Sequence, residues 1–417
     1  MRRILYLANL VIALSVLPAW PSLWAQGTGN VQTIYSFEAP PGATYPGAGP
    51  IIEQSGALYG TTSGGGTTAG CGYFNCGTVY ELVPPASPGG SWPETTLYSL
   101  KGPPDGYSPV AGLVLGVGGT LYGWAAGGTS NQGAVFELSP PTSPGGAWTE
   151  TVLCSFKGPP SDGGRPVGGL AIGANGSLYG ATSGGGTYNQ GTVFELAPPG
   201  SPGGAWTLTV IYNFHGDGDG INPGAGVVIG DNGVIYGTTM YGGALGDGTV
   251  FGIELVSGVW EEKVLLSLDN NLINPIGLVR GHGGVLYGRS EYGIFKATPP
   301  RASGDAWTVQ SLYVGSTFTQ QGSLALGASG AIYWTTPTGG TSTACGVSNG
   351  CGALNELMPP ASPGGAWTLV VLHNFTGQQG DGYQPNAGLV VTKNGAVYGT
   401  TYYGGDNFFG TVFRYTP

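Results

Sequence analysis

Five aspartates recur in short Gly- and Pro-rich segments that each precede a strand-like apolar stretch. The segments read PPDGYSP, SDGGRP, GDGDGINP and GDGYQP. Carboxylates placed in this way could accept hydrogen bonds from sugar hydroxyls, or act as acid and base on a glycoside. The DGDG segment has the density of oxygen ligands that calcium favours, although it lacks an EF-hand spacing. Asp-Gly is also a common turn dipeptide, so a structural role competes with each of these interpretations. The five are Asp105, Asp162, Asp217, Asp219 and Asp381.

Aromatic residues lie in a second set of Gly-rich segments, and two tryptophans interrupt a repeated Tyr motif. Trp124 and Trp334 stand next to the motif where other copies have Gly or Thr. Aromatic rings combine a large apolar face with a polar edge, which suits stacking on sugar rings. Together with the aspartates, these residues would suit carbohydrate binding. The remaining aromatic candidates are Tyr73, Phe74, Tyr188, Tyr241, Tyr402 and Tyr403, with Phe408 nearby.

Four of the five cysteines form two close pairs. Cys71 and Cys76 lie in CGYFNC, and Cys345 and Cys351 lie in CGVSNGC, at the same point of two copies of a repeat. In an exported chain each pair predicts a short-loop disulfide. A metal site built from all four would require the two loops to meet, and we predict none. Cys154 takes a position that other copies fill with Tyr, which indicates a packed thiol.

The first 25 residues have the composition of a secretory signal peptide. Arg2 and Arg3 precede an apolar stretch at residues 4–17, and Ala25 is a small residue at the expected cleavage point. An uncleaved anchor is the alternative. Because no later apolar run is long enough to span a bilayer, we expect a secreted, extracytoplasmic protein with no membrane insertion after cleavage.

Composition excludes several classes of partner and of fold. Charged residues make up 8 % of the chain, the net charge is −10 and only 12 residues are Lys or Arg, so no basic stripe is available for nucleic acid. The chain has 83 Gly and 32 Pro, yet 41 % of its residues are hydrophobic. This combination favours many short strands joined by tight turns over disorder.

A Leu/Ile/Val–Tyr pair recurs through the whole chain, with successive tyrosines 46 to 65 residues apart. The clearest unit, residues 111–156, holds four strand-length segments: AGLVLG, TLYGWAAGG, GAVFELSP and AWTETVLCSF. Repeats of this length predict an all-β, seven-bladed β-propeller of four-stranded antiparallel blades. The expected blades are residues 47–100, 110–156, 167–214, 224–268, 276–314, 322–375 and 386–417 plus 31–37.

The last copy of the repeat has three strands, whereas VQTIYSF at residues 31–37 matches the end of a fourth. We therefore expect residues 31–37 to complete the last blade and close the ring, which makes residues 26–417 one domain. Closure also removes the exposed sheet edges that promote aggregation.

The repeats provide an internal control on the candidate residues. In a propeller the fourth-to-first and second-to-third connections emerge on one face, so the aspartates and aromatics are expected around one rim. His215, His282 and His373 fill positions that other copies give to unrelated residues, so we expect neither a His triad nor a zinc site.

The recurring glutamates of the FEL-type strands indicate scaffolding. The tryptophans that open the fourth strands are expected to pack between blades; they are Trp92, Trp148, Trp206, Trp260, Trp307 and Trp367.

The unit LYGTTSGGG…GTVYEL at residues 58–82, with LYGATSGGGTYNQGTVFEL at residues 178–196 as its cleanest copy, resembles the GloVer tandem repeat. The resemblance covers six or seven units across nearly all of residues 31–417. It implies an exported bacterial protein built as a repeat array, and it brings no assigned reaction. The layout of the strands is also similar to kelch blades, by analogy.

We therefore expect a secreted, non-enzymatic propeller that binds a ligand on the face with the aspartates and aromatics, either a polysaccharide or a component of the cell envelope. A propeller-type glycoside hydrolase or polysaccharide lyase that uses rim carboxylates is the alternative, and a purely structural surface protein is the third. We expect a monomer without a resident cofactor, and calcium at DGDG is the weaker alternative to a simple turn.

Overall fold

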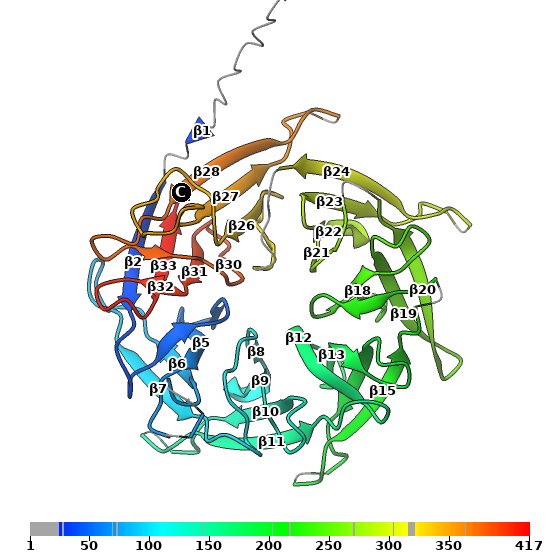
Figure 1. Ribbon diagram of the computed structural model, residues 1–417, viewed down its shortest axis with the longest axis horizontal. Coiled ribbons are helices and arrows are strands. Elements are labelled where there is room, and N and C mark those ends of the chain that lie inside the picture. The colour runs from blue at the N-terminus through cyan, green and yellow to red at the C-terminus, as the bar shows by residue number, and fades with distance from the viewer. Residues whose placement is uncertain are drawn as a thin grey trace, which may run out of the picture.

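Seven antiparallel sheets surround a central axis in the computed structural model (Figure 1). The structure describes residues 25–26 and 29–417, except 69, 72–73, 144, 202, 217, 270–271, 303, 316–321 and 363. The expected signal peptide, residues 1–25, lies outside the described residues apart from its last position. The described residues contain no α-helix, only two 3-10 turns at Val117–Gly119 and His282–Gly284. None of their helices is long and apolar enough to cross a bilayer.

Each blade runs from a first strand at the axis to a fourth strand at the perimeter, and the first strand is the shorter of the two in every blade except blade 3. Blade 1 holds β3 (Thr44–Pro46), β4 (Ile51–Ile52), β5 (Leu58–Gly64), β6 (Thr78–Leu82) and β7 (Glu94–Ser99). Blade 2 holds β8 (Val114–Leu115), β9 (Leu121–Ala125), β10 (Ala134–Ser139) and β11 (Thr149–Ser155). Blade 3 holds β12 (Gly163–Ile172), β13 (Leu178–Gly185), β14 (Thr192–Ala197) and β15 (Thr207–Asn213). Blade 4 holds β16 (Ile221–Pro223), β17 (Val228–Ile229), β18 (Ile235–Tyr241), β19 (Thr249–Val256) and β20 (Val259–Ser267).

The remaining three blades follow the same order. Blade 5 holds β21 (Leu278–Arg280), β22 (Leu286–Arg289), β23 (Gly293–Thr298) and β24 (Thr308–Val314). Blade 6 holds β25 (Ala325–Leu326), β26 (Ile332–Thr336), β27 (Ala353–Met358) and β28 (Thr368–Asn374), and β1 (Ala25–Gln26) pairs with β28 in parallel. Blade 7 holds β30 (Val390–Val391), β31 (Val397–Thr401), β33 (Thr411–Thr416) and β2 (Asn30–Ser36). A small ribbon of β29 (Gly382–Tyr383) and β32 (Tyr403–Gly404) stands beside blade 7.

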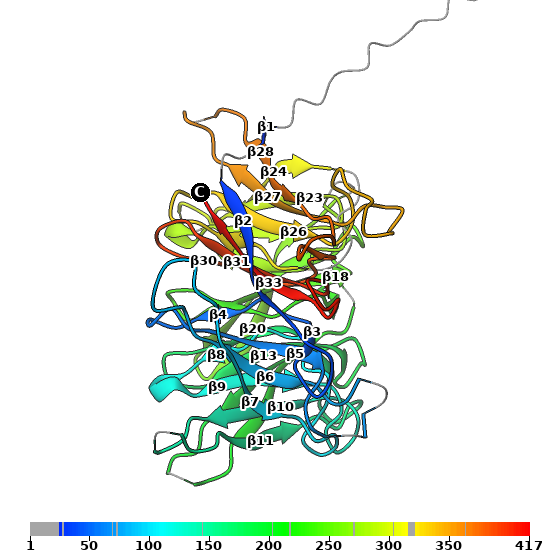
Figure 2. The same cartoon turned by 90° about the vertical axis from the view of Figure 1, so that its left-hand side faces the viewer.

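The predicted closure of the ring is present in blade 7. β2 pairs antiparallel with β33, and both views show the two strands side by side (Figures 1 and 2). The ladder carries a β-bulge between Thr33 and Tyr35, at the position where the fourth strand of each other blade also bulges. β2 is therefore a regular fourth strand supplied from the beginning of the chain, and the fold class predicted from the repeats is correct.

The hydrophobic core lies between the blades. In blades 1 to 6 the Trp that opens the fourth strand packs edge-on against the motif Tyr of the preceding blade, with ring centroids 5.8 Å apart for Tyr122 and Trp206 and 6.1 Å apart for Tyr398 and Trp92. Phe156 and Phe194 pack in the same way across blades 2 and 3, and both are fully buried. The expected packing of these tryptophans is confirmed. Because large rings fill the wedge between neighbouring sheets, the blades are held together largely by buried apolar area.

Both predicted disulfides are formed, between Cys71 and Cys76 and between Cys345 and Cys351. Each closes a connection between the second and third strands of its blade, in blades 1 and 6. Cys154 is a free thiol on β11, where burial raises its pKa to about 12. The predicted packed thiol is therefore protonated at neutral pH.

Candidate ligand site at the central pocket and aromatic rim

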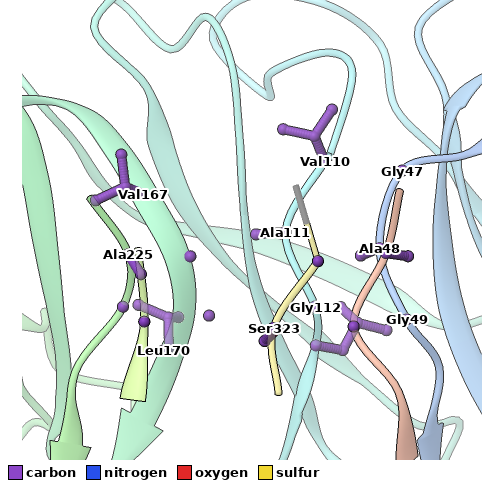
Figure 3. Close-up of a pocket in the computed structure, with 18 of the residues that line it drawn as sticks. Gly47, Ala48, Gly49, Val110, Ala111, Gly112, Val167, Leu170, Ala225 and Ser323 are labelled. Carbon is purple, nitrogen blue, oxygen red and sulfur yellow. The ribbon is translucent and has the colours of Figure 1, made fainter. Parts of the chain in front are cut away.

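A pocket of about 860 Å³ lies on the propeller axis. Its wall is formed by equivalent residues of all seven blades, at or just before each first strand, and Figure 3 shows several of these segments facing a common space. Six of the seven segments carry a small residue followed by Gly or Ser, as in Ala48-Gly49, Ala111-Gly112 and Gly322-Ser323, and blade 5 has Ile276-Gly277 at this point. The pocket is thus a direct product of the sequence repeat.

The glycines are required because neighbouring first strands approach each other closely at the axis. A Cβ on Gly49 would lie 1.9 Å from the carbonyl oxygen of Gly388, and a Cβ on Gly226 would lie 2.1 Å from that of Gly169. No side chain fits at such distances, so a larger residue would force the blades apart.

The described pocket wall carries no charged side chain, because Gly, Ala, Val, Leu, Ile and Pro form most of it. Polar side chains come from Trp124, Ser323, Asn386 and Tyr402. Asn386 Oδ1 is buried and accepts no hydrogen bond from the described residues. A pocket with these walls can bind by apolar contact and by a few hydrogen bonds, but it presents no acid–base pair.

In five of the seven blades, the fourth residue of the second-strand motif joins neighbouring blades close to this wall. Its side chain donates a hydrogen bond to a backbone carbonyl at the start of the next blade. Blade 3 has Ala181 at this position, and in blade 4 the Thr238 hydroxyl has no hydrogen-bond partner among the described residues. Thr61 donates to Ala111 at 3.2 Å, and Trp124 Nε1 donates to Gly168 at 2.6 Å. Thr335, Thr400 and Arg289 make the corresponding bonds to Ala387, Ala48 and Gly322. Arg289 is 1 % exposed, and burial lowers its pKa to about 10, so it remains charged at neutral pH.

An aromatic cluster, named here the aromatic rim, lies where blades 7 and 1 meet. Tyr45 stacks on Tyr402 with ring centroids 5.2 Å apart and 20° between the planes, and Tyr383 stacks on Tyr403 at 5.3 Å. Tyr402 also lines the central pocket, so the rim and the pocket are continuous. Residues from four segments of blades 7 and 1 make up the rim: Tyr45, Phe74, Tyr383, Tyr402, Tyr403 and Phe409.

The phenols of Tyr45 and Tyr403 in the aromatic rim are neutral hydrogen-bonding groups. Burial, followed by the neighbouring phenols, raises the pKa of Tyr45 and of Tyr403. The Tyr402 hydroxyl lies 3.3 Å from Ser63 Oγ, which in turn donates to the carbonyl of Tyr45. All of these rings except Phe74 are partly buried, which fixes their orientation while leaving an edge or a face accessible.

The described rim aspartates are largely buried within their own loops. Asp105, Asp162 and Asp219 are 7 %, 8 % and 5 % exposed, and each carboxylate accepts hydrogen bonds from the backbone of its own loop. Asp381 accepts from Thr376 in the same way. In these loops the Asp side chain is turned inward, because the tight turn aims several N–H groups at one point. Their role in ligand binding stays a prediction.

Asp219 shows the electrostatic balance in these loops. Burial disfavours its charged form, but N–H bonds from His215, Gly216 and Gly220 and the Tyr212 hydroxyl outweigh burial and lower its pKa. His215 Nε2 also lies 3.4 Å from its carboxylate. Asp217 is outside the described residues, so calcium at DGDG stays a prediction. Among the described residues, no group of three His, Cys, Asp or Glu could hold a metal ion.

The two tryptophans singled out from the repeat, Trp124 and Trp334, differ in their surroundings. Trp124 is 9 % exposed and lines the central pocket, whereas Trp334 is 1 % exposed and packs near Tyr313, with ring centroids 6.1 Å apart. Trp124 is the fourth residue of its copy of the Tyr motif, and Trp334 is the third residue of its copy. Because successive side chains of a strand point to opposite faces of the sheet, the two tryptophans point to opposite faces of their blades. Their role in ligand binding stays a prediction.

The predicted aromatic residues are only partly brought together. Phe74, Tyr402 and Tyr403 join the aromatic rim. Tyr188 and Tyr241, 57 % and 43 % exposed, stand apart on blades 3 and 4, and Phe408 is 66 % exposed. Tyr73 lies outside the described residues. Sequence reasoning missed Tyr45, Tyr383 and Phe409; the signal for the first two was a Tyr just before the Pro that enters a first strand.

Comparison with solved structures agrees with the propeller fold. A streptogramin B lyase structure superposes with a TM-score of 0.55 at 14 % identity, over 93 % of this chain and 97 % of that one. A fungal alcohol oxidase of the AA5 family in complex with copper gives a TM-score of 0.55 at 13 % identity, over 94 % of this chain and 77 % of that one. The extracellular domain of a protein from B. thetaiotaomicron, assigned to a hybrid two-component system, gives 0.52 at 11 %, over 92 % of this chain and 39 % of that one. At these identities the likeness concerns the fold alone.

The fold and the repeated pocket wall define a seven-bladed β-propeller built from one recurring unit. The Gloeobacter/Verrucomicrobia repeat matches residues 24–201 and 125–347. The chain belongs to this family, as the repeat motif predicted. No curated protein matches the sequence.

Proposed function

We propose that this protein is a secreted, non-enzymatic propeller that binds a neutral glycan where the aromatic rim meets the central pocket. The observation that carries the proposal is the stacked pair of Tyr45 and Tyr402, of which Tyr402 also lines an uncharged pocket of about 860 Å³. Secretion is supported by the two disulfides, which persist in oxidising compartments, and by the composition of the leader.

A neutral glycan matches the chemistry of this region. Aromatic faces stack on the C–H faces of sugar rings, and tyrosine hydroxyls exchange hydrogen bonds with sugar hydroxyls. The pocket wall offers Ser323 and Asn386, whose buried Oδ1 could accept from a sugar hydroxyl. No cation lines the pocket, and the chain carries a net charge of −10, so an anionic polymer would be repelled.

Binding without catalysis is supported by the state of the rim carboxylates. A glycosidase requires two carboxyl groups on opposite sides of the scissile bond, one of them free to donate a proton. Asp105, Asp162 and Asp219 are buried in their loops, and their oxygens accept backbone hydrogen bonds. Catalysis by these residues and a purely structural role remain the two alternatives that the experiment below distinguishes.

The test is binding of neutral and uronic-acid-containing oligosaccharides to the full chain, measured on an array and then by calorimetry. We expect Y402A to weaken binding about tenfold or more, since loss of ring stacking costs about 1 kcal/mol or more. Y402F keeps the ring and should stay within about threefold of the wild type. Y188A removes a ring that is 57 % exposed on blade 3 and should have no effect.

Three results would contradict the proposal. Equal binding by Y402A and the wild type would place the site elsewhere. Release of shorter products that is lost in D105N or D162N would indicate a hydrolase or lyase. Absence of binding to any oligosaccharide, with Y402A and the wild type melting alike, would leave the structural role.

A further inference from the structure

Three seams between neighbouring blades share one contact at the perimeter. In each, a side chain of the fourth strand reaches the Asp of the loop that leads into the next blade. Tyr98 donates to Asp105 Oδ2 at 3.0 Å, and Tyr212 donates to Asp219 Oδ2 at 2.9 Å. His373 Nε2 lies 3.2 Å from Asp381 Oδ2. A six-atom or five-atom ring therefore fills the space beside the Asp at all three seams.

The seam between blades 2 and 3 has the same backbone but lacks the ring. Cys154 pairs with Val135 in the ladder, just as Tyr98 pairs with Val79 and Tyr212 pairs with Val193. Cys154 therefore occupies the position of the tyrosines at the other seams. Its side chain is shorter than a tyrosine side chain and does not reach across the seam to Asp162.

Asp162 consequently keeps one oxygen without a protein partner. Its Oδ1 accepts from the N–H groups of Lys157 at 2.7 Å and Gly158 at 3.0 Å. Within the described part of the chain, Oδ2 accepts no hydrogen bond, although the residue is only 8 % exposed. The matching Oδ2 of Asp105 and of Asp219 is the atom that accepts the tyrosine hydroxyl.

A second difference between the repeats leaves additional space at the seam between blades 2 and 3. At the Asp105 seam the next blade contributes Glu150, which interacts with both Asp105 and Tyr98. At the Asp219 seam it contributes Glu262, which interacts with Asp219 and Tyr212. Glu150 and Glu262 each stand two residues after the Trp that opens the fourth strand. The equivalent residue of blade 3 is Leu208. The seam between blades 2 and 3 therefore lacks both the ring and the second carboxyl group.

The two substitutions coincide with a pocket of about 570 Å³, named here the Cys154 pocket. Asp162, Lys157 and the serines 155 and 161 lie along it on one side, and Leu208 to Val210 of β15 lie along the other. Lys157 and Ser161 are exposed, so the pocket is open to solvent from the perimeter of the ring.

We propose that the Cys154 pocket binds a para-substituted phenol, whose ring takes the place of the missing tyrosine ring and whose hydroxyl donates to Asp162 Oδ2. The equivalent seams show that this backbone accepts a phenol beside this carboxylate. The apolar walls of Leu208 and Val210 suit the ring, and the protonated thiol of Cys154 adds no charge beside it. A benzoate would be repelled by the Asp162 carboxylate. Phenol groups reach such a pocket either as free small molecules or as a tyrosine side chain of a partner.

The test uses the full chain with its disulfides intact and p-cresol as the probe. A ligand of about eight non-hydrogen atoms should bind with a Kd of about 1 mM, measured by titration calorimetry or by ligand-observed NMR. Toluene, which lacks the hydroxyl, and p-toluate, which adds a carboxylate, should each bind about tenfold or more weakly. An N-acetyltyrosine amide arm, compared with p-cresol, distinguishes a protein-borne phenol from a small one.

Two variants and one measurement on the wild type locate the site. C154Y fills the pocket with its own ring and should abolish binding, while Y212C combined with E262L reproduces both differences at the Asp219 seam and should add a second p-cresol site. In the wild type, saturating p-cresol should slow alkylation of Cys154 several-fold, followed by intact mass. This readout needs no substitution, so it decides the matter if C154Y fails to fold. Equal binding by C154Y and the wild type, no saturable binding at about 20 mM, or unchanged alkylation would overturn the proposal.

Discussion

Thr33 lies opposite Phe413 in the ladder between β2 and β33, although the two residues stand at opposite ends of the described chain. Their pairing closes blade 7 and brings the loop of Tyr45 next to the loop of Tyr402. The aromatic rim therefore exists only when the ring is closed, and stability and binding are linked through the same strand.

Removal of the closing strand tests this relationship. Deleting residues 31–37 should lower the free energy of unfolding by about 5 kcal/mol or more, because the deletion removes the β2 ladder and Phe37. Phe37 is 0 % exposed, and truncation of a buried Phe alone costs about 3 to 5 kcal/mol. Chemical denaturation followed by tryptophan fluorescence measures the change. V117A, at a residue 97 % exposed, is the control and should match the wild type. An unchanged midpoint in the deletion would refute the closure.

Stability should decrease with rising pH because of two half-buried glutamates, Glu150 and Glu262. Burial, and then the Asp105 charge, raises the pKa of Glu150 to about 8, and burial with Asp219 raises that of Glu262 to about 7. Since the folded state holds these protons more tightly than the unfolded state, their contribution is complete below about pH 4.5 and is lost as the pH rises through about 7 and 8.

The matched variant for this pH dependence is E150Q. At pH 5 it should melt like the wild type, and at pH 8.5 it should be more stable by about 1 kcal/mol, a discounted value because solvent screens the half-exposed side chain. Thermal melts from pH 5 to 9 measure the difference. A difference between the two proteins that does not change with pH would contradict the assignment to Glu150.

Trp124 offers a test of the bonds that join the blades at the pocket wall. Its Nε1 donates to the Gly168 carbonyl at 2.6 Å, and Thr61 makes the equivalent bond in blade 1. W124T can restore such a bond, whereas W124V has nearly the same shape and cannot. Both should lose about 2 to 4 kcal/mol of stability from the vacated space. W124V should lose about 1 kcal/mol more, for its unpaired carbonyl. Equal denaturation midpoints for the two variants would show that the bond contributes nothing.

The disulfides should stabilise the protein modestly and locally. They close loops of 5 and 6 residues in sequence separation, for which the chain-entropy account gives about 2 kcal/mol each. Reduction should therefore lower the melting temperature without abolishing folding. Alkylation in denaturant followed by intact mass should add one label before reduction and five after it. Three or more labels before reduction would contradict the pairing.

The architecture could be predicted from the sequence because it depends on periodicity. The Tyr motif, the turn dipeptides and the small residues of the first strands recur in every blade, and each imposes the same local geometry wherever it occurs. The closing strand was also recognisable, because residues 31–37 match the fourth strand of a blade although the first three strands of a blade do not precede them. Cys154 was also recognisable as an exception, because the repeats show what normally stands there.

The candidate site could not be predicted in the same way, since the repeat does not determine where a loop side chain points. Asp105 and Asp162 read equally well as exposed ligands or as turn residues, and only the folded loops show their carboxylates turned onto backbone N–H groups. Tyr45 and Tyr402 are separated by most of the chain, so their stacking depends on ring closure. The sequence determined the blades and their order because these arise from local patterns. The tertiary structure alone decided which side chains meet, because contacts across seams depend on the angle between neighbouring sheets.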